Sequence, residues 1–245
     1  MRSSTASRVV PGTTRDAVDE CIERDGRTYR LIDTAGIRRK GKTKLMAEKL
    51  SVVMARKHLE AADVALLVID ALDGVTAVDA HIAGYAHESG RSIIVLINKW
   101  DLAGPGRKDG KRPADRDIYE RQAHAALKFM PYAPILFISA TSGKYTANIF
   151  STLATVAAER RKRISTGEMN RFLKRVDFER AGVPVSKRVR IYYLTQAQVA
   201  PPTFVLFTDR AVKLHFSYQR FLENQIRKAF GFVGTPIWIK NRARG

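Results

Sequence analysis

IIVLINKWD, residues 93–101, is the stretch that decides the fold. Five apolar residues, four of them β-branched, lead into the polar motif Asn98-Lys99-Trp100-Asp101. An unbroken apolar run of this length is typical of a strand that is buried on both faces of a parallel sheet. Polar residues directly after such a strand lie at its carboxyl end, where ligands bind in open α/β sheets. The stretch therefore predicts a buried strand that ends in a binding loop.

Strand and helix signals alternate along the first two thirds of the chain. Short runs at residues 17–23 and 28–33, joined by the hairpin-turn dipeptide Asp25-Gly26, predict two strands, and apolar runs predict strands at residues 64–69 and 135–138. Apolar spacing and closing residues predict helices at residues 44–62, 77–89, 115–129 and 148–163. This alternation predicts the α/β class, with a mostly parallel sheet that has helices on both faces.

The pattern changes after residue 163. The remainder predicts helices at residues 168–176 and 217–230 and strands at residues 187–196, 203–208 and 235–240. The second helix is amphipathic, with Phe221, Leu222, Ile226 and Phe230 on one face. We therefore expect two domains, residues 1–163 and a small α+β domain at residues 168–245.

The charge is uneven. Of the formal net charge of +19, residues 161–245 carry +13, from 18 Lys and Arg against 5 Asp and Glu. Such a basic segment points to a polyanionic partner, most plausibly nucleic acid. No apolar run reaches the length of a membrane span, and the single cysteine, Cys21, fits a reducing compartment. We expect a cytoplasmic protein with no membrane span.

Asp101 has the most specific chemistry in the chain. A carboxylate in an Asn-Lys-x-Asp loop accepts hydrogen bonds from both N1–H and the 2-amino group of guanine, a donor pair that adenine lacks. Asn98 is expected to tie neighbouring loops together and to contact the base, and the stem of Lys99 to cover the ring face. Residues 98–101, Trp100 included, are therefore a candidate guanine-binding loop.

A second polar motif, Asp33-Thr34-Ala35-Gly36, follows the apolar run at residues 29–32. A carboxylate at the end of a strand can hold Mg²⁺ through water, because Mg²⁺ prefers oxygen ligands and keeps several waters. Gly36 allows a backbone N–H to approach a γ-phosphate without a side chain between them. The motif predicts a metal and phosphate site.

Two weaker signals complete the set. A threonine in residues 11–16, PGTTRD, can add its hydroxyl to the Mg²⁺ shell and its backbone to a γ-phosphate contact. Ser139-Ala140 follows the predicted strand at residues 135–138, and its backbone N–H groups are expected to meet the guanine O6.

In this order the motifs resemble the TrmE–Era–EngA group of GTPases. The tail resembles the C-terminal KH-like domain of the EngA (Der) family, through residues 168–173 (EMNRFL), 190–193 (RIYY), 201–207 (PPTFVLF), 215–218 (HFSY) and 229–232 (AFGF). That family has two tandem GTPase domains followed by the KH-like domain. This chain resembles the second GTPase domain and the KH-like domain, and we expect it to be a C-terminal fragment.

The resemblance implies a factor for assembly of the large ribosomal subunit that binds GTP or GDP with Mg²⁺ and contacts rRNA, not DNA. It implies that Thr14 is the switch I metal ligand, that Asp33 is metal-associated and that Gly36 contacts the γ-phosphate. Thr34, Ala35 and Ile37 complete this loop. Because Ile37 stands where many GTPases carry a water-orienting glutamine, no catalytic residue is assigned. In some relatives K⁺ supports hydrolysis.

No Gly-x-x-x-x-Gly-Lys-Ser/Thr loop precedes Asp33. In the family that loop follows a strand between the one that ends at Asp33 and the one that ends at Asp70. We therefore expect the chain to bind GTP weakly or not at all, which leaves its activity as an enzyme open. The alternative is a non-enzymatic RNA- or ribosome-binding protein that acts through its basic KH-like domain.

The second domain contains one pattern typical of RNA binding. Gly231-Phe232-Val233-Gly234 matches the Gly-x-x-Gly clamp of KH domains by letter. It links a predicted helix to a strand rather than two helices, which favours a helix C-cap and turn. RNA contacts are expected instead from basic residues of this domain: Lys187, Arg188, Arg190, Arg227, Lys228, Lys240, Arg242 and Arg244.

Overall fold

The first unit contains a three-stranded antiparallel sheet. The computed structural model describes residues 8–10, 20–32, 58–105, 107, 109, 110, 112–181, 189–210, 212 and 214–243, and the chain divides into two compact units, Met1–Asp63 and Val64–Gly245. The sheet has the order β1 (Arg8–Val10), β2 (Glu20–Arg24) and β3 (Arg27–Leu31). Asp25 and Gly26 join the last two strands with φ of 50° and 70°, as a type I′ turn requires, so the predicted hairpin is confirmed. Of the helix predicted at residues 44–62, residues 58–61 are described and are helical.

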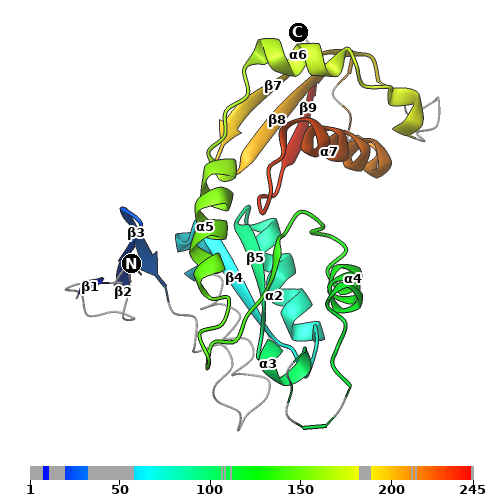
Figure 1. Cartoon of the computed structure of the whole chain (residues 1–245). Coiled ribbons are helices and arrows are strands. Elements are labelled where there is room, and N and C mark those ends of the chain that lie inside the picture. The colour runs from blue at the N-terminus through cyan, green and yellow to red at the C-terminus, as the bar shows by residue number, and fades with distance from the viewer. Residues whose placement is uncertain are drawn as a thin grey trace, which may run out of the picture. The chain divides into compact units, whose positions relative to one another are not determined.

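The second unit begins with a parallel sheet of order β4 (Val64–Asp70), β5 (Ser92–Asn98) and β6 (Ile135–Phe137). Its register places Asp70 beside Asn98, so the polar ends of two strands meet at one edge. The helices that follow these strands are α2 (Ala77–Glu88), α3 (Trp100–Ala103), α4 (Arg116–Ala126) and α5 (Ala147–Arg160). The predicted α/β class with a parallel sheet is confirmed (Figure 1).

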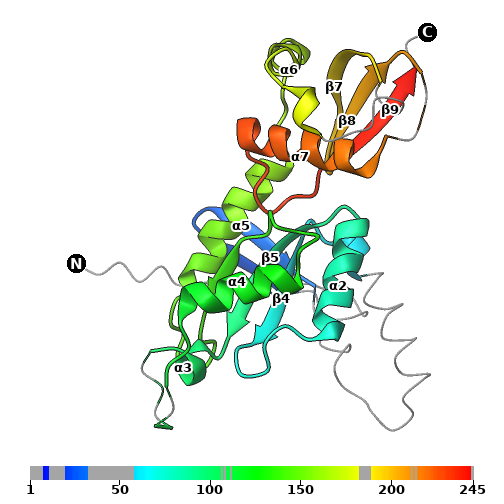
Figure 2. The same ribbon diagram turned by 90° about the vertical axis from the view of Figure 1, so that its right-hand side faces the viewer.

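Helices α2 and α5 lie on opposite sides of the parallel strands in both views (Figures 1 and 2). Ile94 and Leu96 of β5 pack with Val156 of α5, and every residue of β5 before Asn98 is buried. The unbroken apolar run of β4 predicts, like that of β5, a strand buried on both faces, and this prediction is wrong, since Leu66 and Val68 are 36% and 47% exposed. These two side chains share the face that α5 covers over β5, and the described part of α5 does not shield them.

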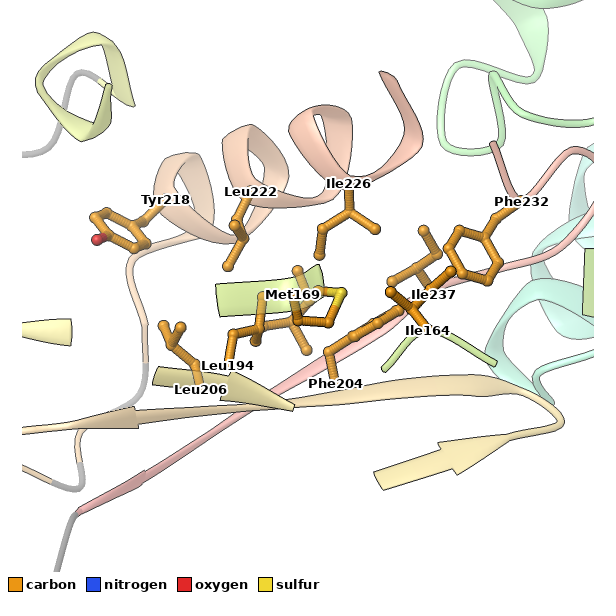
Figure 3. Close-up of a cluster of buried hydrophobic side chains, with 11 residues drawn as sticks. Ile164, Met169, Leu194, Phe204, Leu206, Tyr218, Leu222, Ile226, Phe232 and Ile237 are labelled. Carbon is orange, nitrogen blue, oxygen red and sulfur yellow. The ribbon is translucent and has the colours of Figure 1, made fainter. Parts of the chain in front are cut away.

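The KH-like part of this unit packs two helices against a second three-stranded sheet. Its elements are α6 (Thr166–Leu173), the 3₁₀ turn η1 (Phe178–Ala181), β7 (Ile191–Val199), β8 (Pro202–Thr208), α7 (Phe216–Phe230) and β9 (Trp238–Ala243). β8 is central, antiparallel to β7 and parallel to β9. Figure 3 shows how Leu222 and Ile226 of α7, Met169 of α6 and Phe204 of β8 build one core.

The last strand was predicted at residues 235–240 and is found at Trp238–Ala243. Residues 235–237 therefore precede the strand instead of belonging to it. The Thr235 hydroxyl contacts the Ser92 hydroxyl at 2.8 Å, and Pro236 has no N–H to give to a ladder. The predicted amphipathic helix at residues 217–230 is confirmed, because Leu222 and Ile226 are fully buried.

The turn Gly231–Gly234 anchors the KH-like part to the parallel sheet. Gly231 ends α7 with φ of 87°, which confirms the predicted helix C-cap and turn. The Gly234 carbonyl accepts from the N–H of Ile93 at 2.7 Å, and the Gly234 N–H donates to the Tyr132 carbonyl at 2.8 Å. The Phe232 ring is fully buried in the KH-like core, and its N–H donates to the Glu159 carboxylate of α5.

Gly234→Ala is expected to destabilise the protein through lack of space as well as through backbone strain. A Cβ at Gly234 would lie 2.5 Å from Val156 Cγ2, whereas one at Gly143 meets nothing within 4 Å, and both glycines have φ of +69°. Gly143→Ala should cost about 1–2 kcal/mol from the left-handed backbone alone. Gly234→Ala should cost about 2 kcal/mol more, as overpacking does. Urea unfolding of both variants measures this difference, and equal losses would contradict it.

A second contact in this region involves His87, whose pKa is lowered in the folded protein. His87 Nδ1 lies 2.7 Å from the Tyr132 hydroxyl, and the Arg227 guanidinium stacks on the Tyr132 ring with its Cζ 4.2 Å from the ring centroid. Burial lowers the pKa of His87; the Arg227 charge adds to this effect, whereas Glu223 and Glu88 oppose it. The folded protein therefore favours neutral His87.

This pKa shift predicts that stability falls below neutral pH. Above the unfolded pKa of about 6.5 the imidazole is neutral in both states and contributes no pH dependence. As the pH drops through that value, the unfolded chain binds the proton more readily than the folded chain, so the free energy of unfolding decreases. We expect urea unfolding at pH 7.5 and 5.5 to show this loss in the wild type. His87→Gln, which can still hydrogen-bond Tyr132, should reduce it; an unchanged pH dependence would show that other groups cause it.

Candidate functional site

The carboxyl end of β5 carries the polar motif that the sequence singled out. Asn98 is the last residue of the strand, and Lys99 adopts a left-handed conformation with φ of 60° that turns the chain into α3. Asp101 lies exposed in the first turn of this short helix. The reversal at Lys99 therefore sets Asp101 beside the end of the strand.

Two hydrogen bonds join this loop to the loop after β6. Asn98 Oδ1 accepts from the N–H of Ala140 at 3.0 Å, and the Trp100 N–H donates to the Ile138 carbonyl at 3.1 Å. The tie between loops that was expected of Asn98 is thus present. Because Asn98 and Ala140 are 42 residues apart in sequence, the contact depends on the parallel pairing of β5 and β6.

The loop after β6 uses its own backbone amides. The Ser139 N–H donates to the Lys144 carbonyl, and the Ala140 N–H donates to Asn98 Oδ1, so the oxygen of a ligand would have to compete with both of these acceptors. The side chain of Ser139 is buried, and its Oγ accepts from the Ser142 N–H at 3.3 Å. These bonds hold the loop in a fixed shape before any ligand binds.

Lys99 reaches across to the neighbouring strand. Its Nζ lies 2.6 Å from Asp70 Oδ2, and the other oxygen of Asp70 accepts from the N–H of Leu72. Half of the Lys99 side chain stays exposed, so its stem can lie against a bound ring while its head is held by Asp70. Asp70 was not predicted as a site residue, although its position directly after the apolar run 64–69 indicates a polar strand end at the same edge of the sheet.

Trp100 forms the base of the loop. Its ring is 8% exposed and makes edge contacts with Tyr119 and Phe137, at centroid distances of 5.4 and 4.5 Å. Gly104 packs so closely on this ring that a Cβ would lie 2.5 Å from it. The Tyr119 hydroxyl donates to the Ala71 carbonyl, and burial, with a smaller contribution from the Asp70 charge, raises the pKa of Tyr119.

A cavity of about 360 Å³ opens beside these loops, within the size range of ligand pockets. Asp101 and Ser139 line this cavity. Basic and amide side chains line it as well, and the spacing of apolar residues in the sequence gives no means of predicting them. Its lining comprises Trp100, Asp101, Pro105, Arg116, Leu136, Phe137, Ile138, Ser139, Lys144, Tyr145 and Asn148. The arrangement offers an exposed carboxylate acceptor, fixed loops and an aromatic floor, which together suit a planar base with N–H donors.

The predicted phosphate and metal residues Thr14, Asp33, Thr34, Ala35, Gly36 and Ile37 lie outside the described residues. In the described ranges, no three His, Cys, Asp or Glu side chains gather as metal ligands would. Residues 36–43, GIRRKGKT, fit the letters of a phosphate-binding loop. They begin at Gly36, the last residue of the Asp33 motif, instead of preceding that motif, and they too lie outside the described part.

The structure corrects one predicted RNA contact. The Arg227 side chain is 14% exposed, binds the Glu223 carboxylate at 2.8 Å and donates to the Phe232 carbonyl, so it is a structural residue. Burial lowers the pKa of Arg227, and Glu223 opposes this shift. The other basic residues named for RNA contact divide into two groups. Arg190, Lys228, Lys240 and Arg242 are exposed, and Lys187, Arg188 and Arg244 lie outside the described residues.

The fold and these loops define a class: an α/β GTPase-type unit followed by a KH-like domain. The family described as "50S ribosome-binding GTPase" matches residues 2–99, and "KH-domain-like of EngA bacterial GTPase enzymes, C-terminal" matches residues 163–242. GTPase Der of Ruminiclostridium cellulolyticum is 46% identical over 236 residues, which are 96% of this chain and 52% of that protein. GTPase Der of Moorella thermoacetica is 46% identical over 229 residues, 93% and 51% of the two chains. The chain is a relative of the EngA (Der) GTPases.

The chain spans about half the length of the curated relatives it matches. Among solved structures, Aquifex aeolicus Era bound to GDP and AlF₄⁻ aligns with 18% identity and a TM-score of 0.36, over 84% of this chain and 73% of that one. Within the described residues, no helix is both long and apolar enough to cross a bilayer.

Asn98→Ala should loosen the loop after β6 without unfolding the sheet. Loss of the Asn98 acceptor removes one hydrogen bond, worth about 1 kcal/mol, from the Ala140 amide. Amide exchange measured by NMR should become roughly fivefold faster at Ala140. The Ser139 amide, which donates to Lys144, is the internal control and should keep its rate. Equal acceleration at both amides would mean that the whole loop, not this bond, had been disturbed.

Proposed function

We propose that this chain is part of a guanine-nucleotide-binding factor that assists assembly of the large ribosomal subunit. The observation that carries the proposal is the pairing of Asn98 with Ala140 beside a 360 Å³ cavity that has Asp101 on its wall. Asp101 would accept from N1–H and the 2-amino group of guanine, and the Lys99 stem would cover the base. The names of the relatives, GTPase Der, agree with this nucleotide.

The phosphate side of the proposal rests on resemblance. Asp33 and Thr14 would supply the oxygen ligands that Mg²⁺ prefers, and Gly36 a close N–H to the γ-phosphate. Bound Mg²⁺ would neutralise phosphate charge during hydrolysis, with K⁺ as a further cation. We assign no catalytic base in this chain, because the side chain of Ile37 has no polar atom that could orient water or accept its proton.

We propose further that the isolated 245-residue chain binds GTP weakly. No phosphate-binding loop pattern precedes Asp33, and phosphate contacts normally supply much of the affinity for a nucleotide. The sequence of residues 36–43 matches the pattern of a phosphate-binding loop, so these residues are the alternative phosphate contact that must be tested.

The second candidate function is binding of RNA or the ribosome without nucleotide chemistry. It is favoured by the net charge of +13 on residues 161–245 and by the match of residues 163–242 to the EngA KH-like domain. Large-subunit rRNA in the cytoplasm would be the partner in both candidates.

A fluorescent GTP analogue with Mg²⁺, titrated into the folded chain, tests the nucleotide proposal. We expect a Kd of roughly 0.1 mM or weaker, with competition by GDP but not by ATP. Micromolar binding would contradict the weak affinity, and competition by ATP would contradict the guanine assignment. No binding by a folded chain at millimolar nucleotide would leave the RNA-binding candidate.

Asp101→Asn should change which base is recognised. An amide at this position offers N–H donors, so it suits the C2 carbonyl of xanthine and no longer accepts from the guanine 2-amino group. We expect affinity for the GTP analogue to fall about tenfold or more and affinity for the xanthosine analogue to rise. Asp117→Asn, an exposed carboxylate on α4 outside the cavity lining, is the matched control.

Lys42→Ala tests whether residues 36–43 contact the phosphates. If this variant loses the residual binding of the GTP analogue, the phosphate contact is assigned to these residues.

A further inference from the structure

The sheet of the KH-like part has two chemically different faces. Leu194, Leu206 and Ile239 belong to the core that α6 and α7 cover (Figure 3). Side chains alternate along a strand, so the neighbouring residues Tyr193, Phe207 and Lys240 lie on the opposite face. The register confirms this placement, because Tyr193 is opposite Phe207 and Phe207 is opposite Arg242.

An aromatic pair on this opposite face joins β7 to the central strand β8. The rings of Tyr193 and Phe207 are stacked, with centroids 4.2 Å apart and planes 14° apart, and both residues are partly exposed. By contrast, the core ring of Phe204 on the same strand is fully buried. Half-exposed aromatic side chains on a sheet are a surface on which nucleic-acid bases can stack.

Cations lie beside the aromatic pair. Arg242 is the register partner of Phe207 and Lys240 that of Val205, and both charged side chains are exposed. Strands β7, β8 and β9 contain no aspartate or glutamate. The face therefore combines apolar rings with positive charge alone.

The Gly231–Gly234 turn does not provide the usual KH clamp. Its amides and carbonyls bond Ile93, Tyr132 and Glu159, and Gly234 packs on Val156. RNA bound through this turn would break those bonds. An RNA-binding surface must therefore lie elsewhere on this part of the chain.

We propose that the aromatic–basic face, formed by Tyr193, Phe207, Lys240 and Arg242, binds single-stranded RNA. Unpaired bases stack on the two rings, and their phosphates pair with Lys240 and Arg242. Base faces are hidden in a duplex, so the surface discriminates against paired RNA. This inference rests on the proposed rRNA partner, but it does not depend on nucleotide binding at Asp101.

Fluorescence anisotropy with a labelled 12-nucleotide oligouridine tests the face in the full 245-residue chain. Tyr193→Leu and Phe207→Leu keep apolar volume and remove the π-surface, so each should weaken binding roughly tenfold, as loss of one stacked base does. Phe216→Leu is the matched control, because Phe216 is 73% exposed in the same part of the chain but lies at the start of α7. A 12-base-pair duplex should bind markedly more weakly than the single strand.

The charged residues are tested through the salt dependence of the same binding. Lys240→Gln and Arg242→Gln should each lower the slope of log K against log salt by about 0.7, the value for one phosphate contact on a single strand. Lys174→Gln, at an exposed position directly after α6, should leave the slope unchanged. Wild-type affinity in both leucine variants would overturn the stacking surface, even if loss of charge weakened binding. That result would leave an RNA contact that depends on charge alone. In the comparison of the two oligomers, equal affinity for the duplex and the single strand would overturn the single-strand preference.

Thermal unfolding of each variant and a photocrosslink separate a direct role from a structural one. A folded wild-type chain should crosslink 5-bromouridine in the oligomer to a peptide that contains Tyr193 or Phe207. A crosslink confined to α6 or α7 would contradict the proposed face.

Discussion

Strand β5 is the element on which both ends of the second unit depend. Its apolar residues are buried on both sides and paired with β4 and β6, so its position is fixed, and its two ends also bond segments outside the parallel sheet. At the amino end, Ser92 and Ile93 bond Thr235 and Gly234 of the KH-like part. At the carboxyl end, Asn98 bonds Ala140. A strand that cannot shift without exposing its core holds the KH-like turn and the candidate guanine-binding loop at fixed positions.

This arrangement explains why a pattern that resembles an RNA clamp has become structural. Gly231 and Gly234 both have positive φ, which lets the chain leave α7 and pass close to α5 and β5. In a KH domain the same freedom lets backbone amides approach a phosphate. Here the amides of Phe232 and Gly234 are used by Glu159 and Tyr132. The glycine requirement is the same in both settings, and only the partner of the amides differs.

The sequence predicted those parts of the fold that depend on local signals. The hairpin at Asp25-Gly26, the buried run at residues 93–97 and the amphipathic face of α7 each follow from a turn dipeptide or a periodicity, and each is confirmed. The predictions that were wrong concern features that depend on contacts between distant segments. The start of β9 is shifted because Thr235 bonds Ser92, 143 residues away. Arg227 was assigned to RNA because charge is visible in a sequence, whereas its contacts with Tyr132 and Glu223 are not.

The same limit applied to the candidate site, where the motif identified the residues but not their existing bonds. Asn98 and Asp101 stand at the predicted strand end, since motif spacing and strand length fix them together. The sequence did not reveal that Lys99 is held by Asp70, or that the amides of Ser139 and Ala140 already have acceptors. A loop that satisfies its own donors is preorganised, because little conformational entropy is left to lose when a ligand binds. In the proposed function, base recognition and phosphate binding would therefore make separate contributions: the described loops would supply a rigid acceptor for guanine, and the affinity would depend on phosphate contacts that these loops do not provide.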